Sequence, residues 1–189
     1  MGQFIANDIE RILPGRGNDA PIPVPRGDPF FDPRGTGNAT LPFSRSAFNA
    51  SSASGYRQPI STVTSFVDGS AVYGSDKAVS DALRAPSGGL LAVLVDPAFG
   101  PMLPTAVGVG LPPEYMTNDA ARVPRGYLRA AGDVRANQHP PLLALHTLWG
   151  REHNRLAVEL ARVHPDWDDE ALFQEARKWT VAYIQVGFI

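Results

Sequence analysis

Glycine and proline constrain the fold of this chain more than any other feature, because they interrupt regular structure and are unevenly distributed. The 189 residues include 18 glycines and 18 prolines, most of them before residue 141. Both residues favour turns and short elements over long helices and central strands. We therefore expect the first three quarters of the chain to be rich in loops, and regular helical structure in the last quarter.

The last quarter carries two long helical patterns. Apolar residues recur at helical spacing from Pro140 to Val163, which predicts a helix of about 24 residues, roughly 36 Å long. A second helix is expected to start after Asp166 or Asp168, because either carboxylate can cap it. Its apolar face is expected at Leu172, Ala176, Trp179, Tyr183 and Val186. The short joint predicts an antiparallel helix pair, and the missing stop signal predicts a chain truncated at its C-terminus.

The N-terminal residues 2–13 also show helical spacing, and a Pro-Gly pair follows them. In such a helix Gln3 and Asn7 share one face, whereas Asp8 is turned about 100° away from Asn7. Two neighbouring side chains would therefore face two different sites.

Between the two ends, residues 14–60 lack both helical and strand periodicity and are expected to form an irregular wrapping loop. Residues 77–84 predict a short helix that begins near Ser75 or Asp76, and residues 86–126 return to loop. The fold class expected from these patterns is mainly α, with long irregular loops and little β, in a single domain.

Composition excludes several classes of function. The net charge of −2 and the pI near 6.1 show no basic excess, so we expect no nucleic-acid partner. The chain has no cysteine for a disulfide or a thiolate metal site. The sequence shows neither a signal peptide nor an apolar run long enough to span a membrane.

The stretch TSFVDGSAVYGSD places oxygen-bearing groups at every second residue. If the segment is extended, the side chains of Thr64, Asp68 and Ser70 and the carbonyl of Phe66 can point at one cation. Oxygen-only ligands of this kind suit calcium. The alternative is a β-hairpin that turns at Asp68-Gly69, a frequent use of this dipeptide.

The stretch AGDVRANQHP places Arg135 just before the long helix. A guanidinium in that position can stabilise developing negative charge in a cavity. The alternative is a surface arginine paired with Asp133.

The four histidines do not predict a metal site. His146 and His153 are seven residues apart, about 10 Å along the helix axis, and are expected to be core residues rather than ligands of one metal. His139 and His164 flank helix ends and are expected to be capping or surface residues.

Taken in order, seven segments resemble the animal-type haem peroxidases of the peroxidase–cyclooxygenase superfamily, and they span nearly the whole chain. TSFVDGSAVYGS and REHNRLA are the most specific of them. Within the superfamily, the chain looks most like the N-terminal portion of the peroxidase-like ectodomain of dual oxidases, with bacterial secreted peroxidases next. The segments are GQFIANDI, PVPRGDPFFDP, LPFSRSAF, TSFVDGSAVYGSD, AGDVRANQ, LHTLWGREHNRLA and DDEALFQEARK.

The resemblance implies a partial peroxidase fold in which residues 1–189 form the N-terminal, distal-side portion of one haem peroxidase-like domain. It implies haem b in the complete protein and a structural Ca2+ ion. The implied calcium ligands are Asp8, Thr64, Phe66, Asp68 and Ser70.

The resemblance also assigns the peroxide side of the haem pocket. Gln3 and Arg135 match the family's glutamine and arginine, and Asn7 stands at the position of the distal histidine. Ala6 and Gln138 stand where the family often carries acids that form haem esters, and neither can form an ester. The family's iron-ligating histidine lies downstream of residue 189, so weak or absent haem binding is expected for this chain.

Two functions follow from the resemblance. One is the oxidation of a small electron donor with hydrogen peroxide, in response to oxidative stress, by the complete enzyme. The other is an inactive peroxidase-like ectodomain of a dual oxidase, the hydrogen peroxide-forming NAD(P)H oxidase, that serves as a binding or maturation module. Both imply an extracellular or exoplasmic location, the second beside a membrane oxidase region of the same full-length chain.

Overall fold

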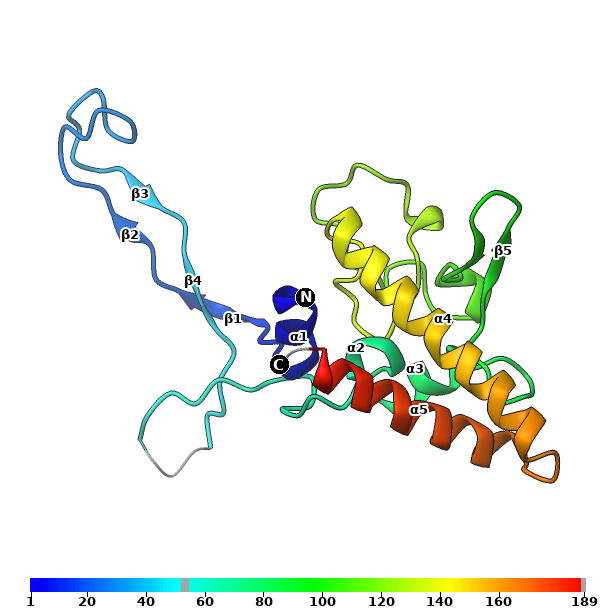
Figure 1. Ribbon diagram of the computed structural model, residues 1–189. Helices are drawn as coiled ribbons and strands as arrows, with labels where there is room; N and C mark the ends of the chain where they lie inside the picture. The colour runs from blue at the N-terminus through cyan, green and yellow to red at the C-terminus, as the bar shows by residue number, and fades with distance from the viewer. Residues whose placement is uncertain (52–54, 188–189) are drawn as a thin grey trace. The chain divides into compact units, whose positions relative to one another are not determined.

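The computed structural model describes residues 1–51 and 55–187, and its contacts divide into two compact units (Figure 1). One unit comprises Met1–Glu10 and Val63–Ile189, and the other comprises Arg11–Thr62. The first unit contains all the α-helices and all the residues that the sequence singles out for chemistry.

Helices α4 and α5 form the frame of the larger unit. Helix α4, Pro140–Val163, has 24 residues, as predicted, and starts with two prolines at positions where a missing N–H is no loss. Helix α5, Asp169–Val186, is capped by Asp168, whose carboxylate accepts a hydrogen bond from the amide of Ala171 at 2.8 Å. In Figure 1 α5 runs back along α4, which confirms the antiparallel pair.

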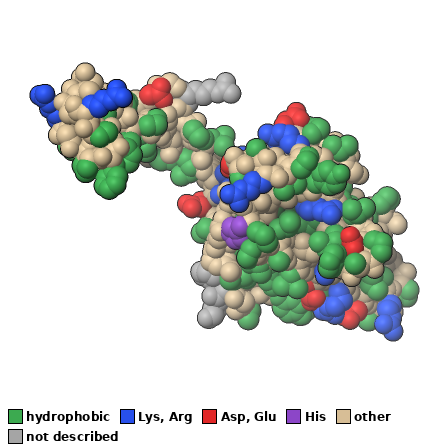
Figure 2. All heavy atoms as spheres, turned by 90° about the horizontal axis from the view of Figure 1, so that it is seen from above, with side chains coloured by type: hydrophobic (Ala, Val, Ile, Leu, Met, Phe, Trp, Pro, Cys, Tyr) green, Lys and Arg blue, Asp and Glu red, His purple; other side chains and the backbone are tan. Residues whose placement is uncertain are grey.

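The buried face of α5 agrees with the predicted one only in part, because Leu172 and Ala176 are buried, as predicted, and the other three residues are not. Trp179, Tyr183 and Val186 are 46%, 41% and 70% exposed, whereas Thr180 and Ile184 are fully buried. The helix is apolar over more than one face, so periodicity alone could not decide which face packs inward. Figure 2 shows that hydrophobic side chains remain exposed over much of the surface of this unit.

Helix α1, Gly2–Ile9, is shorter than the predicted helix over 2–13. The backbone becomes extended at Glu10, and the apolar side chains of Ile12 and Leu13 are 44% and 42% exposed. Residues 11–13 instead form backbone hydrogen bonds to residues 47 and 62 within the second unit. The apolar spacing beyond Ile9 was therefore coincidental.

The stretch Thr64–Asp76 leads into two short helices, α2 (Ser70–Tyr73) and α3 (Lys77–Ala82). Gly69 adopts the left-handed conformation (φ 76°) at the start of α2, so the hairpin alternative at Asp68-Gly69 is wrong. The residues before it form bends rather than an extended strand. Asp76 caps α3 by accepting from the amide of Val79 at 3.0 Å, which confirms the predicted helix start.

Within residues 1–51 and 55–187 the β-structure consists of three two-stranded antiparallel ladders and four isolated bridges, which confirms a mainly α fold with little β. Two of the ladders lie in the second unit, where the sequence predicts only irregular chain. Both strands of a two-stranded ladder are edge strands, and edge strands tolerate the prolines that these segments contain. The ladders pair β1 (Pro14–Asp19) with β4 (Ser44–Ser46), β2 (Ile22–Pro23) with β3 (Thr40–Leu41), and β5 (Leu94–Asp96) with β6 (Gly100–Met102). Two 3-10 turns, η1 (Val107–Val109) and η2 (Arg125–Tyr127), follow.

His153 is a core residue, as predicted, and links α4 to α2 and the 86–93 loop. Its Nε2 lies 2.8 Å from the carbonyl oxygen of Gly89 and its Nδ1 lies 3.0 Å from the hydroxyl of Tyr73. A carbonyl can only accept, so Nε2 carries the proton and Nδ1 accepts from Tyr73. Burial, reinforced by the charges of Arg84 and Arg177, outweighs the Gly89 bond and lowers the pKa of His153 to about 4.

Because the pKa of His153 is lower in the folded chain than its ordinary 6.5, the unfolded state binds this proton more readily. We expect the contribution of His153 to the free energy of unfolding to be fully present above pH 6.5 and to fall by about 3 kcal/mol as the pH drops towards 4. Urea unfolding at several pH values measures this, with His153→Gln compared with the control His164→Gln at the far end of α4. Equal pH dependence in both variants would contradict the assignment.

Candidate functional site

The carboxylate of Asp8 joins α1 to the start of α2. Asp8 is fully buried, and its Oδ1 accepts from the amide of Ala71 at 2.7 Å and from the hydroxyl of Ser70 at 3.0 Å. Its Oδ2 accepts from the amide of Gly69 at 3.0 Å. This arrangement agrees with the predicted rotation of Asp8 away from the face of Gln3.

The second carboxylate of the cluster belongs to Asp68. Its Oδ1 accepts from the hydroxyl of Thr64 and from the amide of Ser70, both at 3.0 Å. The Thr64 hydroxyl also lies 3.4 Å from the carbonyl oxygen of Phe66. The structure thus brings all five predicted calcium ligands into one hydrogen-bonded network, although through a bent loop instead of the extended segment that the sequence predicts.

The electrostatics of this network are those of an uncompensated anionic site. Burial raises the pKa of Asp8, hydrogen bonds from Ala71, Gly69 and Ser70 oppose the shift, and the nearby charge of Asp68 adds to it. Among the described residues, neither carboxylate forms an ion pair with a lysine, arginine or histidine. Two carboxylates, two hydroxyls and a carbonyl are hard oxygen donors whose two negative charges match one divalent cation.

Clusters of acids and histidines do not provide another metal site. Within residues 1–51 and 55–187, no group of three or more His, Cys, Asp or Glu side chains could hold a metal ion. A cation at the Asp8–Asp68 cluster would therefore depend on the hydroxyl and carbonyl oxygens as well as on the carboxylates. The chemistry of the donor set fits calcium.

A second cluster surrounds the first turn of α1. The side-chain amide of Gln3 donates to Oε1 of Gln138 at 2.8 Å, and Oε1 of Gln3 lies 2.6 Å from Nε2 of His139. His139 also caps α4 through Nδ1, which accepts from the amide of Leu142 at 3.1 Å. The capping role of His139 was predicted, whereas its contact with Gln3 was missed because it depends on a residue 136 positions away.

Arg135 binds the other end of α1. Its Nη2 donates to the carbonyl oxygens of Asn7 at 3.0 Å and Glu10 at 2.8 Å, where the helix leaves acceptors unsatisfied. Asp133 accepts from Nε and Nη2 of Arg135 at 2.9 and 2.7 Å. The predicted pairing of Arg135 with Asp133 is present, but Asp133 is buried and the Arg135 side chain is 19% exposed, so this is not the surface pair of the alternative interpretation.

Close backbone packing fixes the position of this arginine. A Cβ atom added at Gly132 would lie 2.2 Å from the amide nitrogen of Gly74 and 2.3 Å from the carbonyl oxygen of Ser70. Only glycine allows the segment that carries Asp133 and Arg135 to approach α2 so closely. The calcium-type cluster and the arginine are therefore positioned by the same short helix.

Asn7 lies between the two clusters and is buried at 5% exposure. Its side-chain Nδ2 has no hydrogen-bond partner among the described residues. Ala6 precedes it on the same helix, and Gln138 is held by Gln3. Such a buried amide donor without a partner is an uncommon feature that points to a missing acceptor.

The described histidines do not supply the iron-ligand side of a haem site. His146 and His153 are enclosed in the core, as predicted, and burial lowers the pKa of both. Both ring nitrogens of His139 are engaged, and His164 stacks on Trp167 at the far end of α4. Nε2 of His146 has no hydrogen-bond partner among the described residues, but this ring is 1% exposed.

Comparison with known proteins establishes the class to which this fold and site belong. The family model described as animal haem peroxidase matches residues 1–187. The chain belongs to the animal haem peroxidase family.

Particular relatives include the human dual oxidase 1, which is 46% identical over 167 residues; the match covers 87% of this chain and 11% of that protein. Peroxinectin A from Dictyostelium discoideum is 36% identical over 195 residues, which cover 97% of this chain and 35% of that protein. This chain thus spans about a tenth of the length of dual oxidase 1 and about a third of the length of peroxinectin A.

Solved structures show the same fold. Peroxidase A from Dictyostelium discoideum superposes with a TM-score of 0.82 and 35% sequence identity, over 97% of this chain and 37% of that one. A fatty acid alpha-dioxygenase from Arabidopsis thaliana, at 21% identity and a TM-score of 0.67, shares the fold over 96% of this chain and 24% of its own. These matches confirm the expected partial peroxidase fold.

The network at Asp8 and Asp68 yields a prediction on calcium removal. We expect calcium at about 100 times its Kd to raise the melting temperature by roughly 5–10 °C, because binding to the folded state alone contributes about 2.7 kcal/mol. Asp68→Asn keeps the shape but removes one charge, and Asp68→Ala removes the carboxylate; both should abolish this shift. Thermal unfolding with EDTA and with calcium measures it.

Asp96→Asn is the matched control, because Asp96 also accepts from two backbone amides, at 2.8 and 3.0 Å, in the β5–β6 turn. It should retain the full calcium shift. An unchanged calcium affinity in Asp68→Asn and Asp68→Ala would exclude Asp68 as a ligand.

Proposed function

We propose that residues 1–189 form the N-terminal, peroxide-side portion of a single haem peroxidase-like domain, to which both compact units belong. The observation that carries the proposal is the segment 133–139, which binds α1 at both ends. Through it, Arg135 contacts the last turn of α1, while Gln138 and His139 contact Gln3 in its first turn. These are the positions that the resemblance assigns to the distal pocket.

The pocket that these residues form is degenerate for peroxide activation. Arg135 retains Nη1, which has no hydrogen-bond partner among the described residues and could donate to a bound oxygen. The amide of Asn7 can also donate, but it cannot take a proton from peroxide near neutral pH. Loss of a general base lowers a rate by roughly 10²–10⁴-fold.

In the complete protein, haem would supply the oxidising chemistry, and hydrogen peroxide with a small electron donor would be the substrates. The proposed physiological setting is oxidative stress. In this chain Gln3 and Arg135 would orient peroxide, while Ala6 and Gln138 leave the cofactor without ester links to this side. Calcium at the Asp8–Asp68 cluster would hold α1, and therefore this wall of the pocket, in place.

A second candidate function is a peroxidase-like ectodomain without peroxidase chemistry, acting as a binding or maturation module of a dual oxidase. Asn7, Ala6 and Gln138 support it, because each replaces a residue that haem chemistry in this family uses. The 46% identity to dual oxidase 1 supports it as well. In this setting the chain would lie on the extracellular or exoplasmic side, next to a membrane oxidase region of the full-length protein.

Within the part of the chain that the structure describes, no helix is both long and apolar enough to cross a bilayer.

Haem binding tests the proposal directly. We expect titration of the purified chain with haemin, with and without calcium, to give no sharp Soret band with a one-to-one endpoint. Nε2 of His146 has no hydrogen-bond partner among the described residues, but His146 is 1% exposed and is enclosed in the core, where haem iron cannot reach it. Calcium should still raise the melting temperature in the same samples. A stoichiometric Soret band would show that a histidine of this chain ligates the iron and would overturn the incomplete-site assignment.

Restoring the distal histidine tests what limits activity. We expect Asn7→His to give no guaiacol oxidation in this chain, since a restored base does not supply an iron ligand. Introduced instead into a full-length protein that carries the downstream histidine, the same substitution should raise the rate by roughly 10²-fold or more. Robust oxidation by the isolated variant would contradict the dependence on the missing proximal half.

A further inference from the structure

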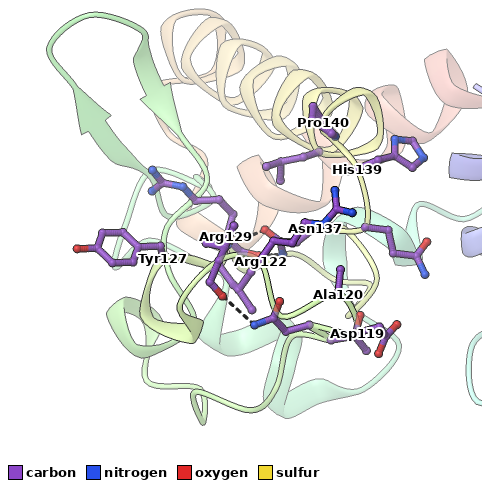
Figure 3. A pocket seen from close by; sticks show the side chains of 14 residues that line it. Asp119, Ala120, Arg122, Tyr127, Arg129, Asn137, His139 and Pro140 are labelled. Atoms are coloured by element: carbon purple, nitrogen blue, oxygen red, sulfur yellow. Dashed lines mark hydrogen bonds between the residues drawn. The ribbon is translucent and has the colours of Figure 1, made fainter.

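A pocket of about 590 Å³ lies beside the cluster of Gln3, Gln138 and His139, between residues 117–129 and the first turn of α4 (Figure 3). This volume is within the range of about 300–1,000 Å³ that small-molecule sites occupy. Gln138 and His139 both contact Gln3 and form part of the pocket wall. In Figure 3 Tyr127 and Arg129 lie towards one side of the pocket and His139 towards the other.

The pocket wall is apolar and is held in shape by side-chain amides. The side chain of Asn137 accepts from the backbone amide of Arg129 at 2.9 Å and donates to its carbonyl oxygen at 2.8 Å. The amide of Asn118 donates to the carbonyl oxygen of Val123 at 2.8 Å. These bonds fix the loop before any ligand arrives. The apolar residues are Ala120, Val123, Tyr127, Leu128, Pro140 and Leu143.

The charged groups at the pocket favour an anion. Two arginines, Arg122 and Arg129, line it against a single acid, Asp119. Arg129 uses Nη1 to bind the carbonyl oxygen of Leu103 at 3.1 Å, whereas Arg122 forms no hydrogen bond or ion pair with any described residue. The positive end of the 24-residue helix α4 adds to this field.

We propose that this pocket binds a small organic anion that combines an apolar, aromatic-sized body with one carboxylate. The body would occupy the surface formed by Leu128, Leu143 and Tyr127. The carboxylate would pair with Arg122, because a guanidinium without a partner can form two parallel hydrogen bonds to it. The inference does not depend on haem, since every residue it uses is present in the described part of this chain.

Benzoate, benzamide and benzylamine are suitable probes, because they share one ring and differ in charge. Titrations of the purified chain, followed by NMR chemical shifts or calorimetry, should show benzoate binding with a Kd of about 1 mM or tighter and the other two at least tenfold weaker. Shift changes should concentrate in residues 117–129 and 137–143.

Arg122→Gln should weaken benzoate binding about tenfold, as expected for the loss of a charge-assisted hydrogen bond at a partly exposed site. Arg162→Gln is the matched control: it removes the same charge from the exposed C-terminal end of α4 and should leave the Kd unchanged. Circular dichroism should show both variants folded, since Arg122 has no internal contact to lose.

Four results would overturn the proposal: benzamide binding as tightly as benzoate, an equal loss in Arg122→Gln and Arg162→Gln, shift changes outside the pocket, or displacement of benzoate by haemin. Haemin also combines a flat apolar body with carboxylates, so it is included as a competitor. Displacement of benzoate by one equivalent of haemin would assign the pocket to the cofactor rather than to a separate organic acid. Benzoate binding that persists in the presence of haemin supports the proposal.

Discussion

The buried carboxylate of Asp8 is the interaction on which the rest of the site depends. It joins α1 to the start of α2 through three hydrogen bonds, and the hydroxyl of Ser70 adds a fourth bond between these helices to the carbonyl oxygen of Asp8 at 2.9 Å. Ionising this group inside the protein is unfavourable, as its raised pKa shows. A calcium ion bound by Asp8 and Asp68 would remove that penalty and convert a source of instability into the joint that positions α1.

Arg135 complements this joint from the opposite end of α1. Its guanidinium neutralises Asp133 and satisfies two carbonyls that the helix leaves open, so it acts as a cap supplied by a distant loop. Most of its donors therefore serve structure. Only Nη1 has no hydrogen-bond partner among the described residues, so the packing role of this arginine accounts for most of its donors.

The sequence was sufficient for features that local chemistry decides, such as the start of α4 at two prolines and a capping aspartate, Asp166 or Asp168, before α5. The grouping of Thr64, Phe66, Asp68 and Ser70 followed from their spacing, whereas Asp8 was assigned to them only by the family resemblance. It was insufficient where distant contacts decide. The end of α1 at Ile9 depends on Arg135, 126 residues away, and the buried face of α5 depends on what α4 leaves uncovered. The Gln3–His139 bond has no local signal, because each residue alone fits a cap or a surface position.

The two residues that precede α4 connect the two sites of the larger unit. Gln138 and His139 contact Gln3 on one side and line the 590 Å³ pocket on the other. A ligand in the pocket would therefore touch the same two side chains that hold the N-terminal end of α1. The Asp8 network holds the other end of this eight-residue helix. The two sites therefore share two side chains, and α1 is held by these side chains at one end and by Asp8 at the other.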